Sequence, residues 1–189
     1  MSIHYPLLAY PWIVVGAVWL ATAARRKKAV ERQPLGRCMA NVLLLFLGYF
    51  LMASSWLGGA WLRVRFVPDT SAVYAIGFAV TVIGAGFAIW ARLTLGANWS
   101  GRPSLVAGHE LVTSGPYAVA RHPIYTGLVT GTAGSAVAIG EWHCVLGALL
   151  VLSAFLLKVG AEERFMLQAF PEAYPRYRAR VKALIPGVF

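Results

Sequence analysis

The chain has 189 residues, of which 59% are hydrophobic and only 13% charged, and its mean hydropathy is +0.65. This composition excludes an ordinary soluble domain of that length. The formal net charge is +10, but no nucleic-acid recognition motif accompanies it, and basic residues at the ends of apolar stretches are attracted to anionic lipid head groups. We therefore expect an all-α integral membrane protein, a single domain over residues 1–189, that binds membrane lipids and no nucleic acid.

Apolar runs long enough to cross a bilayer follow one another along the chain. A hydrocarbon core of roughly 30 Å needs about 20 apolar residues in a helix. Residues 5–24, 39–62 and 72–91 meet that length, and two shorter runs, 124–140 and 142–157, are separated by a very short turn. We predict five transmembrane helices, the last two of which form a helical hairpin.

The basic residues give this arrangement an orientation. Every Lys and Arg except Arg63 and Arg65 falls on one side of the predicted membrane. Cytoplasmic loops carry an excess of basic residues, so we expect the amino terminus outside and the carboxyl terminus in the cytoplasm, in the inner membrane if the source is bacterial. The basic run "RRKK" follows the first helix, which is the reverse of a cleaved signal peptide and indicates a retained anchor. Cys38 and Cys144 then lie on opposite sides, and no metal site is expected.

Polar residues concentrate in two segments, 92–123 and 158–189, which this topology places in the cytoplasm. In the first, "YAVARHPIYTG" predicts that a helix opens at Pro123, because proline suits the first helical turn. The start of a helix favours an anion, and Arg121 and His122 add donors beside it. The small residues that follow allow close approach by a neighbouring helix or by a ligand. A purely structural role, as a helix cap at the head groups, remains equally open.

The second segment places two acids, Glu162 and Glu163, close to the last apolar residue of a membrane helix. Lys158 lies four residues earlier and shares a helical face with Glu162. Two interpretations remain open. The acids belong to a solvated helix end with one weak salt bridge, or one of their carboxylates binds a polar ligand at the membrane surface.

Together the two segments resemble the isoprenylcysteine carboxyl methyltransferases and the related membrane phospholipid methyltransferases. The resemblance covers Leu95 to Pro186 and includes "GHELVTSGPY" upstream of the Arg-His-Pro motif. Its motif residues are Arg121, His122, Pro123, Tyr125, Gly127, Glu162, Glu163, Phe170, Tyr174, Tyr177 and Pro186. It implies a membrane enzyme that binds S-adenosylmethionine in a cytoplasm-facing pocket, with a lipophilic substrate entering from the bilayer.

The resemblance also implies a set of site residues. The cofactor contacts carried over by position are His109, Glu110, Leu111, Val112, Tyr117, His122, Pro123, Ile124, Tyr125 and Glu162, with Glu163 as an alternative to its neighbour. Arg121 and Lys158 are the implied catalytic and substrate-holding residues. The family commonly has arginine at the position of Lys158, and lysine keeps the charge but loses the bidentate fork.

The acceptor class stays open at this stage. A carboxylate, such as that of a prenylated cysteine, is already ionised at neutral pH and needs no general base. A phospholipid amine would have to lose a proton, to His122 or to a glutamate. Two other classes also remain: a nicotinamide-dependent membrane reductase and a non-enzymatic membrane scaffold.

Overall fold

The computed structural model describes residues 5–23, 29–32, 35–54, 59–99, 104–106, 110–185 and 187. His109, one of the predicted site residues, lies outside the described residues. The elements in chain order are α1 (Tyr5–Thr22), β1 (Ala29–Arg32), α2 (Leu35–Ala53), α3 (Gly59–Leu62), α4 (Ser71–Leu95), the 3-10 helix η2 (Gly96–Asn98), β2 (Ser104–Val106), the 3-10 helix η3 (Gly115–Ala118), α5 (Pro123–Ile139), α6 (Trp142–Ala169) and α7 (Ala173–Arg180).

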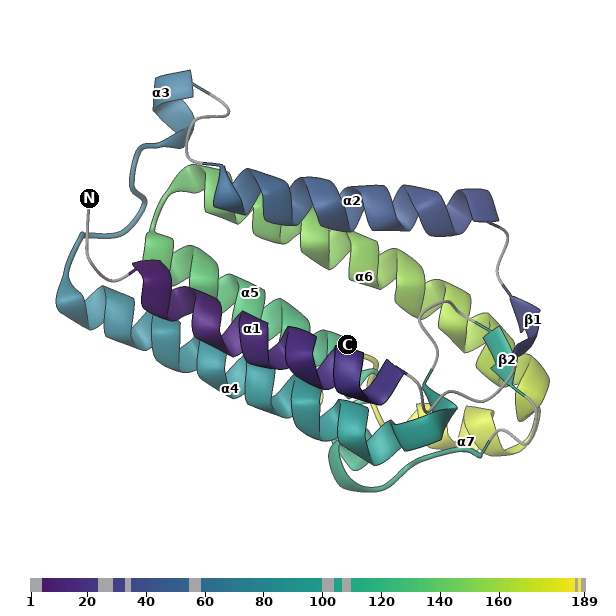
Figure 1. Ribbon diagram of the computed structural model, residues 1–189. Coiled ribbons are helices and arrows are strands. Elements are labelled where there is room, and N and C mark those ends of the chain that lie inside the picture. Colours follow the sequence, from purple (N-terminus) through teal and green to yellow (C-terminus); the bar gives the residue numbers. More distant parts are fainter. Residues whose placement is uncertain are drawn as a thin grey trace.

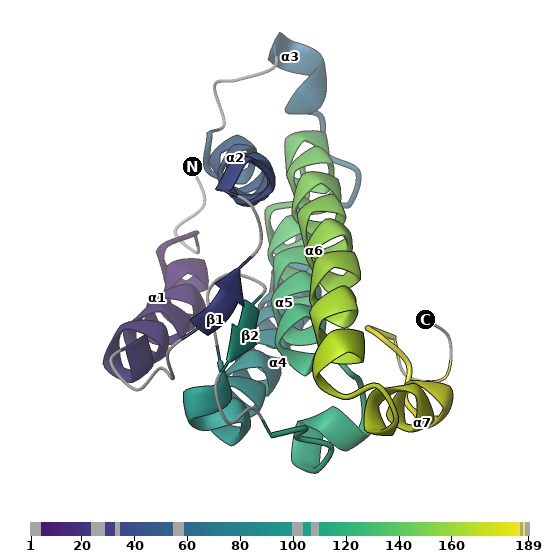
Figure 2. The ribbon, with the colours of Figure 1, turned by 90° about the vertical axis from the view of Figure 1, so that its right-hand side faces the viewer.

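Five long helices lie side by side in a bundle (Figure 1). α4 packs against α5 over most of its length, α2 packs on α6, and α1 packs on α4 (Figures 1 and 2). α3 and the α5–α6 turn lie at one end of the bundle, and β1, β2 and α7 lie at the other. The helical class is therefore confirmed. A short antiparallel pairing of β1 with β2, in which Arg32 lies opposite Ser104, was not predicted.

Local sequence sets the ends of the helices. The Thr70 hydroxyl accepts a hydrogen bond from the Val73 N–H at 3.3 Å and so caps α4. α5 opens with Pro123, as predicted, and it ends at Gly140, whose φ of +78° is the left-handed conformation that glycine adopts without strain. The short link at Gly140 produces the expected hairpin between α5 and α6.

Glycines hold α4 and α5 in close contact. A Cβ atom on Gly84 would collide with the backbone of Gly131, and one on Gly127 would lie 2.5 Å from the backbone nitrogen of Ala88. The Thr81 hydroxyl also donates across this interface to the carbonyl of Gly131 at 3.2 Å. The glycines of α5 thus accommodate a neighbouring helix, the first of the two alternatives left open by the sequence.

Two predicted segments differ from the structure. The run 39–62 is not one helix, since α2 ends at Ala53 and α3 begins at Gly59. Ser54, directly after α2, is a weaker helix former than the Leu, Met and Ala before it. In contrast, α6 continues well beyond residue 157, because Lys, Glu, Arg, Met and Gln in "KVGAEERFMLQ" sustain a helix after the apolar run has ended.

The outer surface of the bundle is apolar. Large exposed side chains include Ile13 on α1, Phe46 on α2, Ile83 on α4 and Leu157 on α6. Among the described residues, two helical stretches are long and apolar enough to cross a membrane, Ser71–Asn98 and Trp142–Ala169. Shorter apolar helices span Pro6–Thr22 and Cys38–Ala53. So large an exposed apolar surface is a feature of membrane proteins.

Candidate functional site

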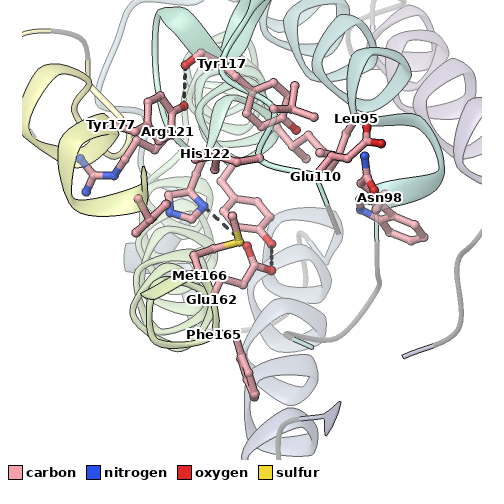
Figure 3. Close-up of a pocket in the computed structure, with 16 residues that line it drawn as sticks. Leu95, Asn98, Glu110, Tyr117, Arg121, His122, Glu162, Phe165, Met166 and Tyr177 are labelled. Carbon is pink, nitrogen blue, oxygen red and sulfur yellow. Dashed lines mark hydrogen bonds and ion pairs between the residues drawn. The ribbon is translucent and has the colours of Figure 1, made fainter. Parts of the chain in front are cut away.

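A cavity lined by both polar and apolar side chains lies at the end of the bundle that carries η3 and α7 (Figure 3). Nine of the predicted site residues line it: Glu110, Leu111, Val112, Tyr117, Arg121, His122, Ile124, Tyr125 and Glu162. Three predicted residues, Pro123, Lys158 and Glu163, are not part of the lining. In the view of Figure 3, His122, Met166 and Glu162 gather at one side and Glu110 and Asn98 at the other. The two polar segments of the sequence therefore meet around one space.

Glu162 presents its carboxylate to this cavity from the part of α6 that follows the apolar run. The Tyr125 hydroxyl donates a hydrogen bond to Oε1 at 2.5 Å, and Nδ1 of His122 lies 3.5 Å from Oε2. The Tyr125 ring stacks on His122 at 5.7 Å between ring centroids and on Phe155 at 4.8 Å. These contacts fix the direction of the carboxylate.

Glu163 faces a different set of partners. The Arg121 guanidinium donates to its Oε1 through Nε, at 3.0 Å, and also through Nη2. Nε of Arg178 on α7 lies 3.5 Å from Oε2. His122 contacts both acids, since its Nε2 lies 3.5 Å from Oε1 of Glu163. The two adjacent acids thus have different surroundings. Glu162 lines the cavity, whereas Glu163 links α6 to the start of α5 and to α7.

The pKa values of these groups follow from the same contacts. Burial would lower the pKa of His122, but its interactions with Glu162 and Glu163 outweigh this and raise it. Burial would raise the pKa of Glu163, whereas His122 and Arg121 bring it down to about 2. The pKa of Glu162 is also lowered, because the contact with His122 and the charge of Lys158 overcome the effect of burial. At neutral pH both carboxylates are ionised, and their charges stabilise the protonated form of the ring between them.

The segment after α7 closes over the turn that precedes α5. The backbone N–H groups of Arg121 and His122 donate to the carbonyls of Lys182 and Ala183 at 2.8 and 3.0 Å. Arg121 also donates from its side chain to the carbonyl of Val181. The N–H groups of Arg121 and His122 are therefore used within the chain, and an anion site at the first turn of α5 itself stays a prediction. The turn is therefore held in place by the segment after α7.

A second anchor holds the opposite side of the turn. The Tyr177 hydroxyl of α7 donates to the Tyr117 carbonyl of η3 at 2.5 Å. Both tyrosines are buried and both line the cavity. The wall formed by η3 is consequently fixed by a residue 60 positions later in the chain.

Two cations lie close to the cavity without joining its lining. Lys158 lies on α6, four residues before Glu162, and its Nζ is 5.2 Å from the centre of the Tyr125 ring. Arg92 is only 1% exposed, donates to the carbonyls of Thr22 and Gly96 at 3.0 Å each, and lies 4.4 Å from the Trp99 ring, which lines the cavity. Arg92 therefore joins the end of α1 to the end of α4 and positions an aromatic wall.

The chemistry of the lining suits a ligand with cationic and aromatic parts. Glu110 and Glu162 offer acceptors for an ammonium or for hydroxyl groups, and Trp99, Tyr117 and Phe165 offer aromatic surface. The cavity volume is about 110 Å³, below the roughly 300–1,000 Å³ usual for small-molecule pockets. A ligand of nucleoside size must displace lining side chains, and Met166, with three rotatable bonds, is the most adaptable of them.

A helical fold with an apolar exterior and an acidic, aromatic cavity at one end defines a membrane protein with a candidate ligand site. A family model described as phospholipid methyltransferase matches residues 72–173, more than half of the chain, and the chain belongs to that family. Its match covers nearly all of α4 and all of α5 and α6, and it includes every lining residue of the cavity except Tyr174 and Tyr177. Membership of a methyltransferase family implies a methyl donor of the S-adenosylmethionine type.

Curated relatives agree with the resemblance to isoprenylcysteine methyltransferases. Protein-S-isoprenylcysteine O-methyltransferase of Schizosaccharomyces pombe is 33% identical over 79 residues, which is 41% of this chain and 34% of the relative. The protein of that name from Xenopus laevis is 30% identical over 149 residues, 75% of this chain and 51% of the relative. The cobalt-zinc-cadmium resistance protein CzcN of Cupriavidus metallidurans is 34% identical over 107 residues, 56% of this chain and 47% of the relative. The chain thus spans between a third and about half of these relatives.

Sequence reasoning missed several lining residues: Leu95, Asn98, Trp99, Phe165, Met166, Tyr174 and Tyr177. Two of them could have been predicted, because Phe165 and Met166 lie three and four positions after Glu162 and so share its helical face. Asn98 and Trp99 carried none, since they follow the end of α4 in a turn whose direction depends on Gly96. Tyr174 and Tyr177 belong to the family motif, but nothing in their spacing indicates that α7 turns back toward η3.

Proposed function

We propose that this chain is an integral membrane methyltransferase that uses S-adenosylmethionine and acts on a lipophilic acceptor, most like the carboxyl group of a prenylated cysteine. One observation carries the proposal: of two adjacent acids, Glu163 is neutralised by Arg121 and Arg178, while Glu162 lines the cavity. An oriented, ionised carboxylate in a partly aromatic cavity suits the ammonium or the ribose hydroxyls of the methyl donor.

Each part of the donor has a matching group in the lining. Trp99, Tyr117 and Phe165 would take the adenine ring, and Glu110 and Glu162 the hydrogen-bond donors. When bound, S-adenosylmethionine would supply a methyl group carried on a positively charged sulfonium. The chain's own contribution is to orient donor and acceptor and to keep water away from them.

The surroundings of His122 favour a carboxylate acceptor over an amine. An amine must lose a proton, yet the raised pKa of His122 increases the fraction of its ring that is already protonated, and the lowered pKa of Glu162 makes that carboxylate a weaker base. A carboxylate acceptor requires no proton transfer. We assign Arg121 to positioning, because its guanidinium is already bonded to Glu163 and Val181. Lys158, whose Nζ lies 5.2 Å from the centre of the Tyr125 ring, is the candidate cation to face an acceptor carboxylate.

We also propose the membrane arrangement in which α1, α2, α4, α5 and the apolar part of α6 cross the bilayer. α6 has 28 residues and is about 42 Å long, so it exceeds a hydrocarbon core of roughly 30 Å and can carry Glu162 beyond the membrane surface. The distribution of Lys and Arg supports an external amino terminus and a cytoplasmic cavity. The lipophilic acceptor would then reach the cavity from the bilayer.

Calorimetry with S-adenosylhomocysteine on the detergent-solubilised chain tests the donor site. Glu162→Gln removes the charge and keeps the shape, so we expect a loss of affinity of roughly 1.5–3 kcal/mol, the range for a hydrogen bond to a charged group. Glu172→Gln, an exposed acid on the border of α7, is the matched control and should bind as the unaltered chain does. Binding of NADPH in place of S-adenosylhomocysteine would support the reductase class, and binding of neither would support a scaffold.

The acceptor class is tested by the stability of the product. Labelled S-adenosylmethionine is supplied with an S-prenylated cysteine derivative or with phosphatidylethanolamine in mixed micelles. A methyl ester releases its label as volatile methanol in base, whereas an N-methyl group does not. We expect label only on the prenylated cysteine, in a form that base releases. Label on the lipid amine that resists base would instead show that the chain is an N-methyltransferase.

A further inference from the structure

A second cavity lies at the opposite end of the bundle from the one described above, between α1, α2 and the α5–α6 turn. Its volume is about 790 Å³, within the range of small-molecule pockets. No residue of the first cavity lines it, so the two spaces are separate in the described part of the chain.

The polar side of this cavity contains two buried atoms that lack hydrogen-bond partners in the described structure. They are Nδ1 of His143 and Oε2 of Glu141, which lie 3.8 Å apart. The His143 side chain is deeply buried, with 2% of the residue exposed, and its Nε2 faces Sγ of Cys144 at 3.3 Å. With its proton on Nε2, the ring presents Nδ1 as an acceptor. A single donor placed about 2.8 Å from each atom would bond to both.

A cationic residue lies beside these acceptors on a fixed loop. The loop pairs with the α5–α6 turn, since the Phe66 N–H donates to the Gly140 carbonyl at 2.8 Å and the Trp142 N–H donates to the Val64 carbonyl at 3.2 Å. Arg63 lines the cavity from this loop. Arg65 lines it as well, but forms an ion pair with Asp69 at 3.4 Å. The polar side thus offers two acceptors for a cation and, next to them, a guanidinium for an anion.

The rest of the cavity is an apolar slot between α1 and α2. It is lined by Leu8 and Trp12 of α1, Met52 of α2 and Ile139 of α5. α1 packs on α4 and α2 packs on α6, and the described contact between α1 and α2 is the edge of Trp12 against Tyr49, with ring centroids 6.1 Å apart. Trp12 is held there by a hydrogen bond from its Nε1 to Oγ of Ser135 at 3.1 Å. An apolar chain can therefore lie between two helices that are kept apart.

We propose that this cavity is a second, non-catalytic site that binds an aminophospholipid of the phosphatidylethanolamine type. The primary ammonium bonds to Glu141 and His143, the phosphate faces Arg63, and one acyl chain lies along the slot. Because the cavity lies at the end of the bundle away from the methyl-transfer site, the lipid occupying it would come from the other leaflet and is not the methyl acceptor. A bound lipid would fill the space between α1 and α2 and stabilise the bundle.

Binding of three lysophospholipids with different head groups to the unaltered chain tests this proposal. Lysophosphatidylethanolamine, lysophosphatidylcholine and lysophosphatidylglycerol of one acyl length are titrated into the detergent-solubilised protein, and binding is followed by native mass spectrometry and by melting temperature. We expect lysophosphatidylethanolamine to bind at least tenfold more tightly than the other two, because only it combines a primary ammonium with a phosphate. Equal binding of all three lipids, or no rise in melting temperature with any, overturns the proposal.

Variants locate the binding site. Glu141→Gln should reduce the affinity for lysophosphatidylethanolamine about tenfold and leave that for lysophosphatidylglycerol unchanged, whereas Arg63→Ala should weaken both. Glu172→Gln serves again as the distant control. Affinity for S-adenosylhomocysteine should stay unchanged in all three variants, which separates this site from the methyl-transfer site. If Glu141→Gln fails to fold, Ile139→Phe, which narrows the slot and keeps every charge, should block the lipid; unchanged lipid binding in that variant contradicts the proposal.

Discussion

Arg121 and Glu163 form a buried ion pair that joins the start of α5 to the charged end of α6, with side chains only 8% and 11% exposed. His122 and Arg178 also contact Glu163, so three side chains from two other parts of the chain depend on one carboxylate. Breaking a buried pair by removing one partner is costly, because the other charge stays behind without compensation.

The first prediction concerns acid stability. The pKa of Glu163 in the folded chain is about 2, below its unfolded value of roughly 4.3, so this group contributes stability above pH ~4.3 that is lost as the pH falls toward 2. Glu163→Gln should therefore destabilise the protein by about 3 kcal/mol at pH 7 and by much less near pH 2. Unfolding measured by tryptophan fluorescence across this range checks it. A constant difference at every pH would show that the charge is not the cause.

The second prediction separates ligand binding from capping at His122. A cap alone contributes about 0.5–2 kcal/mol, but His122 also lies between two carboxylates. We expect His122→Ala to abolish the rise in melting temperature caused by S-adenosylhomocysteine. The melting temperature without ligand should also fall, by more than the loss of a helix cap alone would cause. If the variant keeps the full ligand-induced rise and turnover, the turn is structural and the donor lies elsewhere.

The third prediction uses two glycines of one helix. Gly84→Ala places a methyl group against the backbone of Gly131, and overpacking of this kind costs typically 1–3 kcal/mol. Gly86→Ala is the matched control, because a Cβ there meets no atom within 4 Å, and it should be neutral or slightly stabilising. Thermal unfolding of the two variants side by side is the measurement. Equal melting temperatures would contradict the close packing of α4 on α5.

The fourth prediction concerns topology. Cys144 is completely buried, so its native thiol cannot report the orientation of the chain. In a background lacking both native cysteines, we introduce Asp69→Cys, at an exposed loop position, and Arg176→Cys, at an exposed position of α7. An impermeant thiol reagent on intact cells should label the first and not the second. The reverse pattern would overturn the proposed orientation and place the methyl-transfer cavity outside.

The sequence predicted the elements that depend on local patterns and missed those that depend on long-range pairing. Pro123 and Gly140 marked the ends of α5 correctly, because their backbone preferences act within a single turn. The different roles of Glu162 and Glu163 could not be predicted, since adjacent helical residues point about 100° apart and the partners of each lie on other elements. The break of the second helix near Ser54 was missed because apolar character continues on both sides of it.

The segment that follows α7 has a consequence for how the protein is made. The carbonyls of Lys182 and Ala183 complete the turn at Arg121 and His122, yet a ribosome adding roughly 5–20 residues per second releases them several seconds after that turn. Until then the turn before α5 lacks the two carbonyls that accept its N–H groups. A chain truncated after residue 180 would therefore keep every residue that lines the cavity but lose the contacts that hold the turn at Arg121 and His122 in place.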